Sequence, residues 1–298
     1  MRVPRPRRQP RPDQPAPLTG PARRRHRTDR HEGVIHVALS LDIITLGAAH
    51  PQTANAFYTA AFSPTTTGDG LDLHGTGRLT FRPVGELAGE TGTDPATSGF
   101  RGYVLSAIVN QPDEVEALLD LAIANGATVV KPAKKKLFGE FTAVYRAPDG
   151  ALWKLAAATK KNTRPVPDPI APTETAIYLG VTKPTASKTF YEALGMRVER
   201  DYGDTFIDFT ITHGVCRLGL LPRKALAKDA GVDAHGDGFS AAMLTHTAAS
   251  RDDLDGLLKA ADAAGGTVTA PATRTDEGDH VARLTDPDGF HWKITAPA

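Results

Sequence analysis

The sequence predicts an α+β fold of two homologous domains, each built from two βαβββ units. The main observation is an internal repeat, because residues 99–155 align without a gap with residues 238–294 and 20 of these 57 positions are identical. A second match links LGAAHPQTANAFYTAAF (46–62) to LGVTKPTASKTFYEALG (179–195) near the start of each copy. The order of strand and helix patterns is also the same in both copies, and 298 residues suffice for two domains.

The repeat sets the expected domain boundaries. The first domain is expected over 41–157 and the second over 173–296, with a charged, proline-rich linker over 158–172. Residues 1–36 are rich in Arg and Pro and hold few apolar side chains, so they cannot offset the entropy of ordering. We expect a disordered tail there, or an extension that arises from a misassigned start codon.

Each repeat presents its elements in the same order. An alternating strand (41–48 or 175–181) comes first, and a helix that begins at a proline follows it (51–62 or 184–195). Short strands lead to a central strand at 102–109 or 240–246. A second helix with acidic residues in its first turn ends at a glycine, over 112–126 or 251–265. Three more strands complete the repeat.

The last two strands of each repeat are joined by the same turn, in APDGALWKLA (147–156) and DPDGFHWKIT (286–295). Proline fixes φ in such a turn, and glycine closes it into the next strand. Side chains alternate between the two faces of a strand, so the Lys of each copy faces away from its Trp neighbour. We expect Trp153 and Trp292 to pack against the helices, with Lys154 and Lys293 on the opposite face.

Composition excludes several classes of function. Ten arginines lie in the first 33 residues, and the rest of the chain is mildly acidic, which argues against a nucleic-acid-binding core. No apolar run reaches the length of about 18 residues that spans a bilayer, so we expect no membrane partner. We also expect no signal peptide, because no apolar segment follows the basic first residues. A single cysteine, Cys216, excludes a disulfide within the chain, so we expect a buried, unreactive thiol and a cytoplasmic location.

Taken together, these patterns resemble the vicinal oxygen chelate superfamily, which includes glyoxalase I, bleomycin-resistance proteins, extradiol dioxygenases and fosfomycin-resistance enzymes. The resemblance rests on the helix opening with Phe57-Tyr58 or Phe190-Tyr191, the acidic helix that ends in glycine, and the closing PDG strand. It implies that each pair of βαβββ units curves a mixed sheet into a cup, with helices outside and the ligand inside.

The resemblance also implies where a metal would bind. Enzymes of this superfamily hold a divalent metal in the cup with His or Glu side chains, and the metal acts as a Lewis acid. The corresponding positions in this chain are Ile43 and Ala176, residues 102–104 and 241–243, and Lys154 and Lys293. None of these is His or Glu, and a protonated lysine has no lone pair to offer. We therefore expect no metal cofactor.

The residues expected to bind a ligand lie on the same face as the two lysines. They are Lys154, Lys293, Tyr178, His291, Thr45 and Thr295. A lysine in the cup has three interpretations: it pairs with an acid, it binds an anionic or oxygen-rich ligand, or it acts as a catalytic amine. With Tyr178, His291 and Lys293 together, the second domain is expected to have the more polar cup. The first is expected to be more apolar, with Ile43 and Leu152 inside.

Two functions are weighed from the sequence, and a third, a purely structural interaction module, stays open beside them. The favoured one is a metal-free binding protein that holds a small organic molecule, as the resemblance to bleomycin-resistance proteins implies. The alternative is a glyoxalase-like lyase, isomerase or dioxygenase that uses an unusual metal site or a lysine, so enzymatic activity stays undecided and the catalytic residues unknown. A homodimer stays open too, because sheets of this kind also serve as dimer interfaces.

Overall fold

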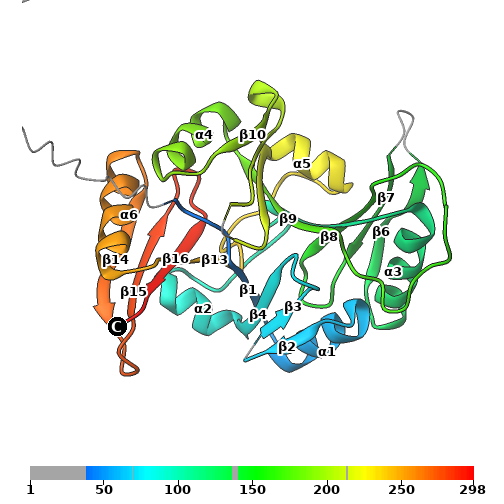
Figure 1. The fold of residues 1–298 in the computed structure, drawn as a ribbon, viewed down its shortest axis with the longest axis horizontal. Coiled ribbons are helices and arrows are strands. Elements are labelled where there is room, and N and C mark those ends of the chain that lie inside the picture. Colours follow the sequence, from blue (N-terminus) through cyan, green and yellow to red (C-terminus); the bar gives the residue numbers. More distant parts are fainter. Residues whose placement is uncertain (1–37, 69, 136–139, 213) are drawn as a thin grey trace, which may run out of the picture. The chain divides into compact units, whose positions relative to one another are not determined.

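The computed structural model describes residues 38–68, 70–135, 140–212 and 214–298. The tail expected over 1–36 lies outside these residues. Within them, strands form two mixed eight-stranded sheets (Figure 1). None of the helices in the described ranges is long and apolar enough to cross a bilayer.

The first sheet has the strand order β14-β15-β16-β13-β1-β4-β3-β2. Its strands are β1 (Ile43–Ala48), β2 (Thr65–Thr67), β3 (Gly70–Asp72), β4 (Arg78–Pro83), β13 (Ala242–Thr247), β14 (Thr267–Arg274), β15 (His280–Thr285) and β16 (His291–Ala296).

The second sheet has the order β10-β11-β12-β9-β5-β8-β7-β6. Its strands are β5 (Tyr103–Val109), β6 (Thr128–Lys135), β7 (Phe141–Arg146), β8 (Leu152–Ala157), β9 (Glu174–Val181), β10 (Val198–Asp201), β11 (Ile207–Phe209) and β12 (Arg217–Pro222). The short helix η1 (Gly203–Thr205) lies between β10 and β11.

Each sheet joins one βαβββ unit from each repeat. In the first sheet β1 pairs antiparallel with β13, and Ile43 lies opposite Thr245. In the second, β5 pairs antiparallel with β9, and Ser106 lies opposite Ala176. Figure 1 shows the blue and cyan strands of the first unit beside the orange and red strands of the last. The fold class is as predicted, but each cup joins units of different repeats: the second and third units form the second sheet, and the first and last units form the first.

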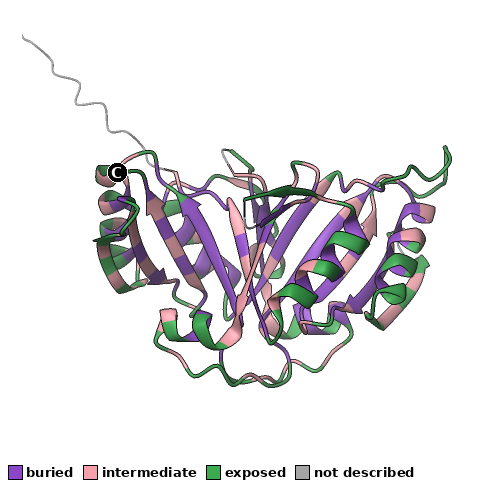
Figure 2. Cartoon of the chain, turned by 90° about the horizontal axis from the view of Figure 1, so that it is seen from below, coloured by how far each residue is buried: buried purple, intermediate pink, exposed green. Residues whose placement is uncertain are grey.

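Four helices cover one face of the sheets: α1 (Pro51–Phe62), α3 (Pro112–Ala124), α4 (Pro184–Ala193) and α6 (Arg251–Ala263). Each turns an apolar stripe inward, as Leu254, Leu257 and Leu258 do on α6. At the start of α6 the Ser250 side chain accepts a hydrogen bond from the Asp253 amide at 3.1 Å, which caps the helix. Figure 2 shows the buried strands and the exposed outer sides of these helices.

The Phe-Tyr pair of α1 connects the two sheets. The Tyr58 ring lies 5.1 Å from Phe81 of the first sheet and 5.8 Å from Trp153 of the second, measured between centroids. The Tyr58 hydroxyl accepts a hydrogen bond from the Trp153 indole at 3.0 Å and donates one to Asp149 in the PDG turn at 3.0 Å. Trp153 and Trp292 are fully buried, which confirms that both belong to the core.

Two short helices that the sequence analysis did not predict lie on the opposite face of the sheets. They are α2 (Val84–Thr91) and α5 (Arg223–Ala230), cyan and yellow in Figure 1. Leu226 on α5 packs with Val104 and Leu152, in a cluster separate from the main core. Each helix ends at a glycine with positive φ, Gly92 or Gly231, a conformation that glycine adopts without strain. A short helix therefore lines each cup, in addition to the sheet.

Candidate ligand-binding cups

The clearer of the two candidate sites, here called the Lys154 cup, is the face of the second sheet beneath α5. A cavity of about 480 Å³ opens there. Strands β5, β8, β9 and β12, the β10–β11 segment and α5 all contribute to its wall. The residues that line it include Val104, Ser106, Ile108, Lys154, Ala156, Tyr178, Phe206, Leu221, Leu226 and Asp229. The volume falls in the range of about 300–1,000 Å³ that is typical of small-molecule sites.

Lys154 is held in this cavity by carboxylates. Its Nζ lies 2.9 Å from Asp229 Oδ2 on α5 and 3.7 Å from Glu140 Oε2. The lysine side chain is only 17% exposed, so the ion pair is shielded from most of the solvent. Of the three interpretations of this lysine, the geometry favours pairing with an acid.

An aromatic wall forms one side of the Lys154 cup. The Tyr178 and Phe206 rings meet edge to face with their centroids 6.0 Å apart, and Tyr202 stacks on Phe206 at 6.3 Å. Tyr202 is 65% exposed and therefore lies toward the solvent. Gly219 makes room for the tyrosine, because a Cβ on it would lie 2.6 Å from Tyr178 Cδ1. Burial, with a smaller contribution from the Glu174 charge, raises the pKa of Tyr178 to about 12, so its hydroxyl stays protonated as a donor.

The second candidate site, here called the Lys293 cup, is the matching face of the first sheet beneath α2. Lys293 lies beside Thr245 on β13, and Thr245 lies beside Ile43 on β1. Thr45 is two residues further along β1, and its hydroxyl is 2.8 Å from the Thr80 hydroxyl. Along β16 the side chains alternate between half-buried and buried, which places His291, Lys293 and Thr295 on the cup face.

The prediction that Tyr178, His291 and Lys293 share one cup is wrong. Tyr178 lines the cavity of Lys154, whereas His291 and Lys293 lie on the other sheet with Thr45 and Thr295. The reason is the exchange of units between repeats, because β9 pairs with β5 and not with β13. The expected apolar pair is split in the same way, because Ile43 lies on the floor with Lys293, whereas Leu152 packs with Leu226 beneath α5.

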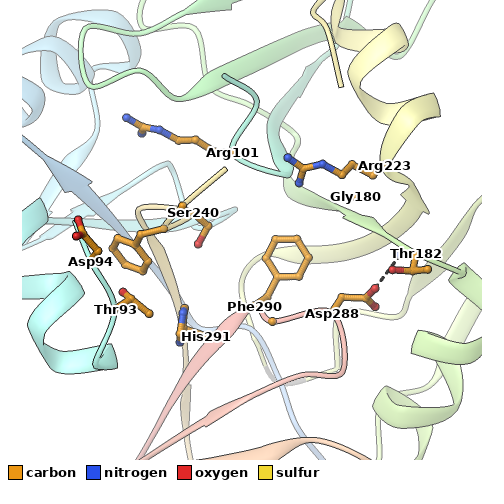
Figure 3. A pocket seen from close by; sticks show the side chains of 13 residues that line it. Thr93, Asp94, Arg101, Gly180, Thr182, Arg223, Ser240, Asp288, Phe290 and His291 are labelled. Carbon is orange, nitrogen blue, oxygen red and sulfur yellow. Dashed lines mark hydrogen bonds between the residues drawn. The ribbon is translucent and has the colours of Figure 1, made fainter. Parts of the chain in front are cut away.

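A further cavity of about 580 Å³ lies where loops from several units meet, and His291 lines it (Figure 3). Two of its charged side chains, Arg223 and Asp288, are already engaged by the protein. Arg223 donates to the carbonyls of Phe100, Gly236 and Ala234 at 2.6, 3.0 and 3.1 Å. Asp288 accepts from the Thr182 amide at 2.7 Å and the Ser187 hydroxyl at 2.5 Å. This cavity therefore offers fewer free polar groups than its size suggests, and burial lowers the pKa of His291.

The sequence analysis missed two carboxylates that face the lysines, Asp229 on α5 and Glu90 on α2. They occupy equivalent positions, because the offset of 139 that relates Lys154 to Lys293 also relates Glu90 to Asp229. The signal was available in the sequence: Pro83 and Pro222 precede two eight-residue segments, and Gly92 and Gly231 follow them.

The residues that the structure brings together on the floors of both cups do not fit a divalent cation. Sheet register aligns Lys154, Ser106 and Ala176 across one floor, and Lys293, Thr245 and Ile43 across the other. Neither row contains a His, Asp, Glu or Cys ligand, and an ammonium group repels a cation. In the described part of the chain no three such ligands gather elsewhere. Cys216 takes no part, since it is buried and burial raises the pKa of its thiol.

Comparisons with known proteins agree with this architecture. The family model of the Glyoxalase/Bleomycin resistance protein/Dioxygenase superfamily matches residues 33–155 and 172–294. A search of the curated proteins finds no match.

Two solved structures illustrate the similarity of fold. Glyoxalase I from Zea mays is 14% identical with a TM-score of 0.58, and the alignment covers 87% of this chain and 92% of that one. A candidate dioxygenase from Bacillus subtilis subsp. subtilis str. 168 is 13% identical with a TM-score of 0.57, covering 87% of this chain and 85% of that one. Identities this low show a shared fold and leave the activity to the residues of the cups.

Proposed function

The chain belongs to the Glyoxalase/Bleomycin resistance protein/Dioxygenase superfamily, and from that premise we propose that it is a metal-free binding protein for a small, largely apolar organic molecule. The Lys154 cup is the proposed site. One observation carries the proposal: a cavity of about 480 Å³ lies where the fold holds ligands, and its floor presents an ion-paired lysine instead of a metal ligand.

The lining of the cavity indicates the class of ligand. Val104, Ile108, Leu221 and Leu226 supply apolar contact, and Tyr178 and Phe206 offer ring faces and edges. The Tyr178 hydroxyl is the polar group best placed to orient a ligand. An aromatic molecule with one or two acceptors fits this lining better than a sugar or a polyanion does.

The repeat supplies a matched pair of variants to test the proposal. Ala156 lines the cavity, and its equivalent in the other cup is Thr295. The probe is N-phenyl-1-naphthylamine, an uncharged aromatic dye whose fluorescence rises in apolar sites. We expect saturable binding of one dye per chain, loss of binding in Ala156→Phe, and unchanged binding in Thr295→Phe. Binding that both variants retain would overturn the proposed site.

A metal-dependent lyase, isomerase or dioxygenase is the competing function, and the same assay separates the two. Dye binding should be unchanged after dialysis against EDTA, and elemental analysis of the untreated protein should find less than one divalent metal per chain. A stoichiometric metal whose removal abolishes dye binding would contradict the metal-free proposal.

A further inference from the structure

The two cups can be compared residue by residue, because equivalent elements are related by fixed offsets, which are 133 residues for β1 and β9 and 139 for the elements below. β4 and β12, like α2 and α5, are related by 139 residues, as are Lys154 and Lys293. Asp229 therefore corresponds to Glu90. At two further positions the Lys154 cup has an apolar residue where the Lys293 cup has an arginine: Leu221 corresponds to Arg82, and Val144 to Arg283. Each cup serves as an internal control for the other.

The two arginines of the Lys293 cup bind the carboxylate of Glu90. In the Lys293 cup, Glu90 Oε1 forms an ion pair with Arg82 at 2.9 Å, and Glu90 Oε2 accepts a hydrogen bond from Arg283 at 2.9 Å. Both carboxylate oxygens of Glu90 are therefore bound by arginines and not by Lys293. Burial alone would raise the pKa of Glu90, but the Arg283 hydrogen bond and the charges of Arg82, Arg283 and Lys293 together lower it.

Lys293 is left with excess positive charge around it. Within the described ranges it forms no ion pair, whereas Lys154 pairs with both Asp229 and Glu140. Three cations thus surround one carboxylate at the base of the Lys293 cup, with Glu86 further out, 60% exposed and bound to Arg82. Arg283 Nε is a further donor, buried and without a hydrogen-bond partner among the described residues.

The rest of the cup face is hydroxylated. Thr45, Thr80, Thr245 and Thr295 stand where the Lys154 cup has Tyr178, Gly219, Ser106 and Ala156. Thr45, Thr80 and Thr295 are half-buried, so the face between the strands and α2 is open to solvent. Hydroxyls that donate and accept, beside a lysine with no ion pair in the described residues, match the chemistry of a hydroxylated organic oxyanion.

We propose that the Lys293 cup is a second binding site, for a small hydroxylated molecule that carries a carboxylate or phosphate group. Lys293 binds the oxyanion as a point charge, Arg283 adds a guanidinium beside it, and the threonines contact the hydroxyls. This site is separate from the apolar site around Lys154, so one chain would hold two ligands of different chemistry.

Isothermal titration with L-malate, glycerol 3-phosphate and glycerol tests the proposal on the full chain. We expect at least one of the two anions to bind with one site per chain, and the uncharged glycerol to show no binding. Malate alone identifies a carboxylate ligand, glycerol 3-phosphate alone a phosphate ligand, and both a general oxyanion site. Equal binding of glycerol, or no binding of either anion, would overturn the proposal.

Variants locate the site. Lys293→Met should weaken anion binding by tenfold or more, and Lys154→Met should leave it unchanged. Glu90→Gln removes the competing carboxylate and should tighten binding by about tenfold. The double variant Arg82→Leu, Arg283→Val copies the other cup, frees Glu90 to pair with Lys293, and should abolish binding.

The dye assay for the Lys154 cup serves as the folding control for the variants of the Lys293 cup, and circular dichroism serves for Lys154→Met, because Lys154 lines the dye site. Unchanged dye binding shows that a variant is folded, and it also separates a failure of this inference from a failure of the proposed function. Equal losses of anion binding in Lys154→Met and Lys293→Met, with the circular dichroism spectra of both variants unchanged, would refute the assignment to the Lys293 cup.

Discussion

Asp286, the first residue of the DPDG turn, should make the protein less stable as the pH rises. Its side chain is only 3% exposed. Its Oδ2 accepts from the Tyr191 hydroxyl at 2.6 Å, and its Oδ1 accepts from the amides of Phe290 and Asp288 at 2.8 and 3.0 Å. Burial, with a contribution from the Asp288 charge, raises its pKa to about 6 against these hydrogen bonds.

The direction of this pKa shift determines how the stability of the protein changes with pH. A carboxyl whose folded pKa lies above its unfolded pKa, about 3.9 for Asp, binds its proton more tightly in the folded state. Its contribution to stability is therefore complete below about pH 4 and is lost as the pH rises through about 6. Two pKa units correspond to about 3 kcal/mol in total, of which about 1.4 kcal/mol should be lost between pH 5 and pH 8.

Urea unfolding of the wild type and Asp286→Asn at pH 5 and pH 8 measures this effect. The variant cannot ionise at this position, so its free energy of unfolding relative to wild type should rise by about 1.4 kcal/mol from pH 5 to pH 8. Any cost of replacing the hydrogen-bonded oxygen is present at both pH values and cancels. Asp276→Asn, in an exposed turn, serves as the control and should show no such rise. A difference that is the same at both pH values would refute the raised pKa.

Two further predictions concern stability. Arg217 is 9% exposed and binds Glu174 at 2.7 Å and Glu199 at 2.6 Å, so Arg217→Met should cost about 3 kcal/mol in urea unfolding. Arg251→Met, which breaks a more exposed pair with Asp255, should cost less than about 1 kcal/mol, and equal costs would contradict the role given to burial. The lowered pKa of Glu90 stabilises the folded state above its unfolded pKa, and this contribution is lost as the pH falls through the folded value. The melting temperature should therefore fall less steeply between pH 6 and pH 3 for Glu90→Gln than for wild type. Parallel curves of melting temperature against pH would contradict the lowered pKa of Glu90.

The sequence was sufficient wherever the signal was local or repeated. The alternation around Trp153 and Trp292 placed both rings in the core and both neighbouring lysines on the other face. Burial alternates in the same way along β16, where Trp292 and Ile294 are buried and Lys293 is half-buried. The structure keeps this alternation because one face of each strand is buried in the core.

The pairing of units could not be predicted in the same way. β1 and β9 are homologous, and so are β5 and β13, so either pairing satisfies the same side-chain pattern. Nothing local distinguishes a repeat that closes on itself from one that exchanges units. That choice decided whether Tyr178 lies with Lys154 or with Lys293.

The short helices escaped prediction for a different reason. Each has eight residues and only two or three buried side chains, which is too few to establish a helical period. Glu90 and Asp229, the acids that distinguish the two cups, went unrecognised with them. For the candidate sites, the sequence therefore predicted the positions of the two lysines but not the acids that face them.

The exchange of units between repeats also sets an order in which the chain can complete its sheets during synthesis. Ser106 meets Ala176 across a gap of about 70 residues, whereas Ile43 meets Thr245 across about 200. At a ribosomal rate of about 5–20 residues per second, β13 is synthesised roughly 10–40 seconds after β1, with which it pairs. The second sheet and α5 have all been synthesised by residue 230, so the Lys154 cup can form on the ribosome while the Lys293 cup still lacks β13 to β16.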